Sequence, residues 1–111
     1  MTTIRTDNSS ITLINTFFVS PERADDLVQV LTEATKAVMR RQPGFISANL
    51  RVSLDRQRVV NYAQWRSKSD FEAMQSNPEV APRMKRAAEI AERFDPVLYA
   101  VKYVDDDPES T

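Results

Sequence analysis

Four stretches of the chain have the alternating or continuously apolar pattern of β-strands. Residues 11–19 (ITLINTFFV) are rich in β-branched and aromatic residues, and residues 45–54 alternate apolar with polar side chains. A polar segment at residues 55–57 suits a hairpin loop, and residues 59–65 (VVNYAQW) follow it as the third predicted strand. Residues 97–104 (VLYAVKYV) form the fourth predicted strand. We expect the inward face of the second strand to consist of Ile46, Ala48, Leu50, Val52 and Leu54.

Apolar residues between the first two strands recur at the spacing of an amphipathic helix. Ser20 and Pro21 suit the start of a helix, because a hydroxyl can cap it and proline fits its first turn. A stripe at positions i, i+4, i+7 and i+11 then predicts the buried side, at Leu27, Leu31, Ala34 and Val38. Gly44, preceded by a proline, is expected to stop the chain from continuing as a helix.

Two further helical segments lie between the third and fourth strands. Ser67 and Asp70 have the spacing of a capping box and open a short helix that carries Phe71 and Met74. A second helix is predicted to follow Pro82 and to end at residues 95–96. Its inward side chains are expected to be Met84, Ala87, Ala88, Ala91 and Phe94.

The resulting order, β-α-β-β-α-β, predicts an α+β fold of the ferredoxin-like type, with helices on one face of an antiparallel sheet. Helices on one face leave the other face bare, yet the strands carry large apolar residues on both faces, as at Phe17 and Phe18. A bare apolar face of this size marks an interaction surface. The sequence therefore predicts a homodimer that packs sheet against sheet.

The length of 111 residues suits a single domain, which we place at residues 11–104. Residues 1–10 are interpreted as an N-terminal arm, and residues 105–111 (DDDPEST) as a disordered acidic tail. A net charge of −1 argues against a nucleic-acid partner, which needs a surplus of basic residues. No apolar run is long enough to span a membrane, and the absence of cysteine favours a cytoplasmic location.

The residue types that the chain lacks exclude several kinds of active site. The sequence contains no histidine and no cysteine, which removes imidazole and thiolate metal ligands and every nucleophile that depends on histidine. Gly44 is the one glycine, so no glycine-rich loop is present to hold a nucleotide phosphate. We therefore expect an enzyme of this composition to use neither a metal nor a nucleotide cofactor.

Asn61 is an unusual residue for the strand in which it lies. Strand side chains alternate between faces, so Asn61 shares a face with Val59, Ala63 and Trp65. A buried amide must find hydrogen-bond partners, and strands are depleted of asparagine. Asn61 has a structural interpretation, a bridge between strands or a bulge, and Trp65 alone is typical of a core anchor. Asn15, in the first strand, raises the same question.

Several segments together resemble the antibiotic biosynthesis monooxygenase family. The likeness extends over residues 11–104 and rests on Asn15 in the first strand, on PGFISANL, on VVNYAQWRS and on FEAM. The resemblance implies a dimeric α+β barrel. It also implies oxidation of an anthrone-like aromatic to a quinone by O₂, without metal or flavin. The catalytic residues that the resemblance implies are Asn15, Asn61 and Trp65.

The resemblance further implies how the substrate is bound. We expect substrate contacts from Phe17, Phe71, Met84 and Arg86. Some members of the family have a tyrosine where this chain has Phe71, so one proton donor is missing here. Haem-degrading relatives share Asn15 and Trp65 but bind the haem iron through a histidine, which this chain lacks.

The chemistry of a cofactor-free oxygenase agrees with this set of residues. The substrate must itself donate an electron to O₂, so the protein has to supply an apolar pocket and donors for a developing oxyanion. Amide N–H groups fill that role, and tryptophan adds a rigid stacking surface. Two alternatives remain open from the residues: a protein that binds a small aromatic without turnover, and a polyketide cyclase or isomerase.

Overall fold

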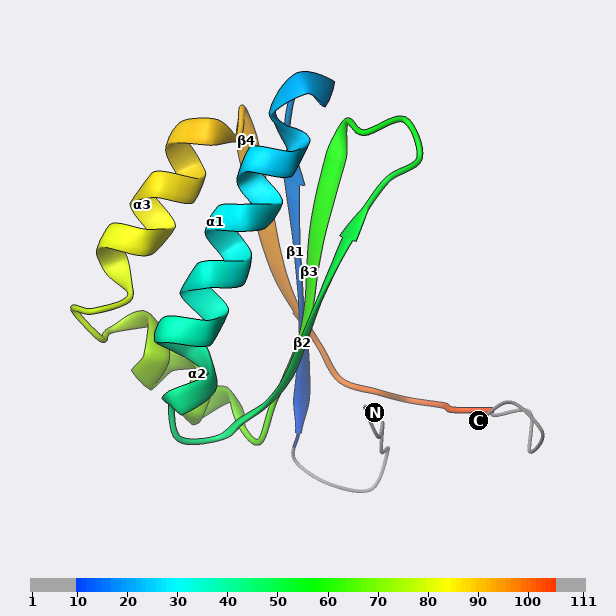
Figure 1. Cartoon of the computed structure of the whole chain (residues 1–111). Helices are drawn as coiled ribbons and strands as arrows, with labels where there is room; N and C mark the ends of the chain where they lie inside the picture. Colours follow the sequence, from blue (N-terminus) through cyan, green and yellow to red (C-terminus); the bar gives the residue numbers. More distant parts are fainter. Residues whose placement is uncertain (1–9, 106–111) are drawn as a thin grey trace.

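The computed structural model describes residues 10–105, and its strands form one antiparallel sheet with all helices on one side (Figure 1). Two short 3₁₀ turns, η1 and η2, flank the first helix. In chain order the elements are β1 (Ile11–Phe18), η1 (Pro21–Arg23), α1 (Ala24–Ala37), η2 (Met39–Arg41), β2 (Phe45–Val52), β3 (Arg58–Trp65), α2 (Lys68–Gln75), α3 (Ala81–Ile90) and β4 (Arg93–Tyr99).

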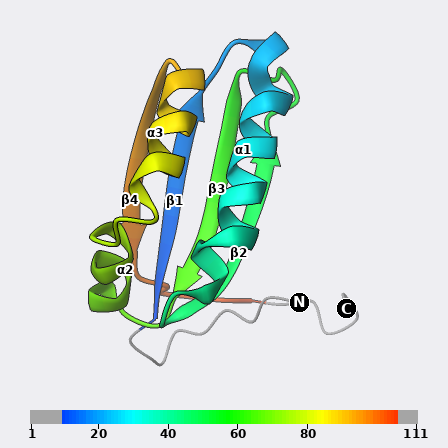
Figure 2. The same ribbon diagram turned by 60° about the vertical axis from the view of Figure 1, so that its left-hand side comes forward.

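The strand order across the sheet is β2-β3-β1-β4, with every neighbouring pair antiparallel. This order confirms the predicted ferredoxin-like α+β fold, in which β1 and β3 are the central strands. Viewed from the helical side, α1 runs along β3 and β2, while α3 lies over β1 and β4 (Figure 2). The short α2 lies at one end of the same layer, where β3 ends.

The first helix buries the stripe that the sequence predicts. Leu27, Leu31, Ala34 and Val38 are all buried. The chain turns at Gly44, whose φ of +84° is a left-handed conformation that side chains with a Cβ rarely adopt. A Cβ at Gly44 would also collide with the carboxylate of Asp70.

A bulge in β2 changes which of its side chains face the helices, so part of the inward face predicted for this strand is wrong. The register shifts between Phe45 and Ser47, so Phe45 lies opposite Trp65 on the helical face. Ile46 is consequently 47% exposed instead of inward. Leu54 was also predicted to point inward, but it is exposed because it lies beyond the end of the strand, in the hairpin loop.

The last strand begins and ends earlier than predicted. The prediction that residues 95–96 end a helix is wrong, because α3 stops at Ile90 and both residues lie inside β4. An edge strand tolerates a proline such as Pro96, since one of its sides has no ladder to maintain. The strand ends at Tyr99 because its pairing partner in β1, Thr12, lies next to the start of that strand. Phe94 therefore belongs to β4, and Ala88 is exposed instead of inward.

The hydrophobic core lies between the sheet and the helices in two clusters. One is built around Phe17, Leu27 and Val59, and the other around Trp65 and Phe71. Almost all of the predicted arm and acidic tail lies outside the described residues. No helix in the described part of the chain is long and apolar enough to cross a membrane.

Candidate functional site

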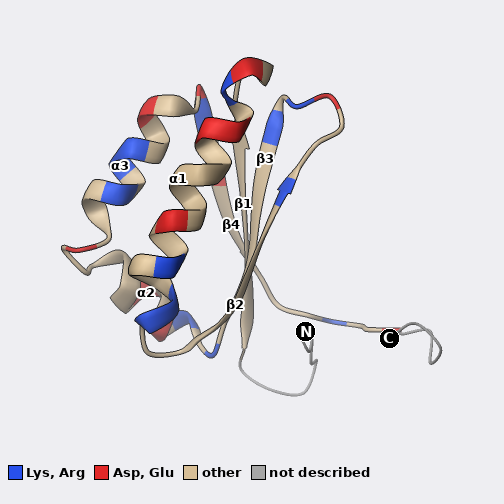
Figure 3. Cartoon of the chain, in the orientation of Figure 1, with Lys and Arg blue, Asp and Glu red and all other residues tan. Residues whose placement is uncertain are grey.

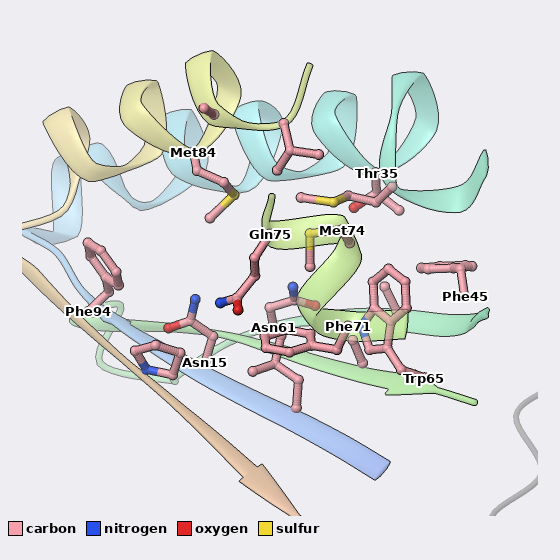
Figure 4. A pocket seen from close by; sticks show the side chains of 17 residues that line it. Asn15, Thr35, Phe45, Asn61, Trp65, Phe71, Met74, Gln75, Met84 and Phe94 are labelled. Atoms are coloured by element: carbon pink, nitrogen blue, oxygen red, sulfur yellow. The ribbon is translucent and has the colours of Figure 1, made fainter. Parts of the chain in front are cut away.

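A cavity of about 250 Å³ lies between the sheet and the helical layer. Seventeen side chains line it, and Figure 4 shows them from close by. All four strands contribute to its floor, and α1, η2, α2 and α3 contribute to the opposite wall. Its surface is mainly apolar, with a small number of amide groups. This composition is typical of a pocket for a small organic molecule.

Asn15 and Asn61 form the polar centre of the floor. They are direct partners across β1 and β3, so their side chains start from neighbouring positions on the helical face. Asn15 is buried, at 5% exposure, and both amide oxygens are buried without a hydrogen-bond partner. The amide nitrogens point away from the sheet toward the helices (Figure 4). Each asparagine therefore offers N–H donors to a molecule in the cavity.

Trp65 forms the inner end of the cavity. Its indole is almost fully buried and makes edge contacts with Phe45 and Phe71, with ring centroids 5.6 Å and 6.1 Å away. These contacts fix the ring plane, so the indole presents a rigid wall. Its Nε1 is buried and has no hydrogen-bond partner in the described part of the chain.

The unpartnered polar groups are unusual for a folded core. Buried polar atoms are nearly always hydrogen-bonded, and each one left without a partner costs about 1–3 kcal/mol. Three such atoms, from Asn15, Asn61 and Trp65, belong to residues of this one cavity. Such a cluster is expected where a bound molecule or water completes the hydrogen bonding.

The structure brings five of the predicted site residues together and separates two others. Phe71 and Met84 line the cavity with the two asparagines and Trp65. Phe17 is buried in the core next to Phe94, with ring centroids 5.8 Å apart, and does not line the cavity. Arg86 is exposed on α3 and borders a separate polar depression against α1.

Most of the lining residues were not predicted as site residues from the sequence, and three of them, Phe45, Phe94 and Gln75, show why. Phe45 reaches the cavity because of the bulge in β2, and Phe94 because β4 begins before residues 95–96. Gln75 follows Met74 and lies four residues after Phe71 on α2. The helical spacing from Phe71 was the signal that could have identified Gln75.

Among the described residues that line the cavity, none has a charged side chain and none is a tyrosine. Within residues 10–105, no three His, Cys, Asp or Glu side chains come together as a metal site requires. The hydrogen bond from the Ser53 hydroxyl holds the pKa of the Asp55 carboxyl below its ordinary value. Asp55, however, is exposed in the β2–β3 loop and does not line the cavity. The cavity can therefore donate hydrogen bonds and stack on rings, but it offers no side chain that titrates near neutral pH.

Comparison with known proteins shows the family to which the chain belongs. The family model described as antibiotic biosynthesis monooxygenase matches residues 10–89. The chain is 44% identical over 82 residues to the tetracenomycin-F1 monooxygenase of Streptomyces glaucescens, covering 74% of this chain and 73% of that protein.

Solved structures show the same fold. The ActVA-Orf6 monooxygenase of Streptomyces coelicolor, in complex with nanaomycin D, superposes with a TM-score of 0.81 at 25% identity, covering 89% of this chain and 93% of that one. SnoaB, a cofactor-independent oxygenase of Streptomyces nogalater, superposes with a TM-score of 0.77 at 23% identity, covering 86% of this chain and 96% of that one. With a matching family model and a relative of this similarity, the chain belongs to the antibiotic biosynthesis monooxygenase family and is a monooxygenase.

Proposed function

We propose that this protein oxidises an anthrone or dihydroquinone of a polycyclic aromatic polyketide to the quinone, with O₂ and without a cofactor. The observation that carries the proposal is the pairing of Asn15 with Asn61 on the floor of an apolar cavity. Their amides have no partner within the described chain and face the space that a ring system would occupy. The tetracenomycin and nanaomycin named for the relatives are compatible with a polyketide substrate.

The shape of the cavity supports a multi-ring substrate. Asn61 and Trp65 are four residues apart on one face of β3, which is a separation of about 13 Å along the strand. A flat ring system can then stack near Trp65 at one end and place an oxygen between the two asparagines at the other. A single small ring would reach one of these positions but not both.

The proposed reaction balances without an added oxidant or reductant. The anthrone methylene loses its two hydrogens and gains a C=O bond, while O₂ supplies that oxygen and its other atom leaves as water. The four electrons come from the anthrone itself. A dihydroquinone gives up only two electrons and two protons, so O₂ then leaves as hydrogen peroxide. The asparagine N–H groups stabilise the anion that must form before an electron passes to O₂, and one donor of this kind is worth about 3 kcal/mol.

The proton has to leave without a base from the cavity wall. Because no carboxylate, lysine or tyrosine lines the cavity, we infer that the substrate arrives as its phenolate or enolate. Neutral amide donors suit an anion of this kind, since they stabilise the charge without taking the proton. The apolar lining also keeps water from the reactive intermediate.

The absence of a cofactor is part of the proposal. The sequence of 111 residues has no histidine or cysteine, so the common ligands of iron, copper and zinc are lacking in it. SnoaB, described as a cofactor-independent oxygenase, shares the fold of this chain. We also propose that the enzyme works in the cytoplasm, as its lack of cysteine favours, and as a homodimer formed through the helix-free face of the sheet.

Oxygen uptake tests the reaction. The purified protein is mixed with 1,8-dihydroxyanthrone in an oxygen electrode, and quinone formation is followed by absorbance. We expect one O₂ consumed for each quinone formed, at a rate proportional to enzyme and above that of autoxidation in buffer. The same rate is expected after exhaustive chelation, because no metal takes part.

Three results would contradict the proposal. Binding without faster uptake would indicate a carrier of aromatic molecules. Conversion of a polyketide without oxygen consumption would indicate a cyclase or isomerase. Activity that disappears with the chelator and returns with iron or copper would overturn the cofactor-free mechanism.

A further inference from the structure

Gln75 reaches into the cavity from the helical wall. It is the last residue of α2, and its side chain turns toward Asn15 and Asn61 (Figure 4). Its amide makes no hydrogen bond with any residue of the described chain. An exposed glutamine can hydrogen-bond to water, so a missing protein partner is not unusual in itself. Gln75 is exposed as a residue, but it also lines the cavity, where its amide is available to a bound molecule.

The exposed lining residues locate the mouth of the cavity. They are Gln75 and Ala81 on the helical side and Phe94 and Pro96 on the edge strand β4. Trp65, at the opposite end, is buried. A flat molecule therefore enters between α2 and β4, and Gln75 is the polar group that it passes.

The position of Gln75 is fixed by the helix that carries it. At its start, the Ser67 hydroxyl accepts a hydrogen bond from the backbone N–H of Asp70 at 3.1 Å. Beyond its end, Asn77 donates to the side chain of Gln42 at 3.1 Å. Phe71 and Met74 bury the inner face of the helix between these two points. Gln75 therefore starts from an anchored backbone and not from a loose surface turn.

Gln75 is the available polar group of the helical wall. Among the lining residues from the helices, Thr35 is the other one with a polar side chain. The Thr35 hydroxyl is already used, because it donates to the backbone carbonyl of Leu31 at 2.9 Å. An oxygen on the substrate that faces the helices thus has Gln75 as its partner.

We propose that Gln75 binds an oxygen substituent of the substrate and so selects hydroxylated polycyclic aromatics over bare ring systems. This inference rests on the proposed function and adds a third amide to the pair on the floor. A glutamine amide both donates and accepts, so it can bind a phenol hydroxyl or a quinone oxygen. Its amide faces the asparagine pair from the helical wall, at the mouth of the cavity, and its contact contributes to binding instead of to the chemical step.

Trp65 supplies a direct readout of binding, because it is the single tryptophan of the chain. Its fluorescence is titrated with 1,8-dihydroxyanthraquinone and, separately, with unsubstituted anthraquinone. Gln75→Leu keeps a similar volume and removes the amide. We expect it to weaken binding of the dihydroxy compound about fivefold, the value of one neutral hydrogen bond, and to leave binding of anthraquinone unchanged. Gln75→Asn keeps an amide on a shorter side chain, so its affinity for the dihydroxy compound is expected to lie between those of the parent protein and Gln75→Leu.

Gln29→Leu is the matched control, because Gln29 is an exposed helical glutamine that does not line the cavity. It should bind both compounds as the parent protein does. Turnover adds a second readout: Gln75→Leu is expected to raise KM for 1,8-dihydroxyanthrone about fivefold and to leave kcat within about twofold. A thermal melt of each variant identifies any loss of folding.

The outcomes separate this inference from the proposed function. Equal weakening of both compounds, no change for either, or failure of the parent protein to prefer the dihydroxy compound would each overturn the role of Gln75. If the binding preference depends on Gln75 but no oxygen is consumed, the binding role stands and the oxygenase proposal falls. If oxygen is consumed and Gln75→Leu changes neither KM nor the binding preference, the oxygenase proposal stands and the binding role of Gln75 falls.

Discussion

Asn61 is half-buried in the middle of a central strand, where a buried amide oxygen without a hydrogen-bond partner destabilises the fold. Its Oδ1 is buried and unpaired, as is that of its cross-strand partner Asn15. An apolar side chain of the same shape would remove that cost, since the unpaired polar atom is what makes the site unfavourable. Stability alone therefore favours leucine at this position, and the presence of asparagine points to a role toward a bound molecule.

We predict that Asn61→Leu separates activity from stability. The substitution should lower kcat for anthrone oxidation by at least about 100-fold with little change in KM, because the lost donor acts on the oxyanion and not on the ground state. The midpoint of thermal unfolding should stay the same or rise. Asn49→Leu is the control, since Asn49 is a strand asparagine that does not line the cavity, and activity should largely persist. A destabilised Asn61→Leu variant with full activity per folded molecule would return Asn61 to a structural role.

At the scale of elements, the helix α2 is held by its first turn. Asp70 hydrogen-bonds to the Ser67 hydroxyl, pairs with Arg66 at 3.1 Å, and packs against the turn at Gly44. Arg66 also donates its backbone N–H to the carbonyl of Gly44 at 2.7 Å. The turn before β2 and the start of α2 therefore form one unit that sets where Phe71 and the rest of the helix meet the cavity.

We predict that Gly44→Ala destabilises the protein by more than about 1–2 kcal/mol, the cost of a left-handed conformation for a residue with a Cβ. The added methyl group also displaces Asp70. Urea unfolding of Gly44→Ala, Asp70→Ala and the double variant measures both effects. The double variant should be more stable than the sum of the single losses predicts, because Asp70→Ala removes the close contacts with the carboxylate, although the contact with the Cβ of residue 70 remains. Strict additivity would show that the methyl group and the carboxylate do not compete for space.

The elements that the sequence predicted well are those whose pattern is local. The stripe of α1 and the cap at Ser67 depend on residues a few positions apart, and both are present in the structure. The bulge at Phe45 and the start of β4 depend on the neighbouring strand, so a local pattern could not reveal them. The site divides in the same way: the alternation within β3 placed Asn61 and Trp65 on one face, whereas Phe45 and Phe94 enter the cavity through pairing.

At the scale of the whole molecule, the sheet has one covered and one helix-free face. Lys, Arg, Asp and Glu lie mainly on the helices and at the ends of the strands, while the middle of the sheet is largely uncharged (Figure 3). The strand register places six apolar or aromatic residues of β1, β3 and β4 on the helix-free face: Ile14, Phe18, Val60, Tyr62, Val97 and Tyr99. Val97 and Tyr99 are 37% and 47% exposed. A second copy of the chain has the same face, so a dimer through this face would bury both residues at once.

We predict that the protein is a homodimer at micromolar concentration, with an interface above about 1,200 Å² in total. Val60→Glu places a carboxylate on the helix-free face beside Arg51 of β2, so it is combined with Arg51→Gln to remove the counter-ion. The partner would leave the remaining charge unsolvated, so this double variant should dissociate to a monomer. Leu54→Glu makes the same kind of change on the fully exposed hairpin loop and should remain dimeric. Sedimentation equilibrium gives the mass of each. A monomeric parent protein would rule out the dimer, and a dimer that survives the double substitution would place the interface elsewhere on the molecule.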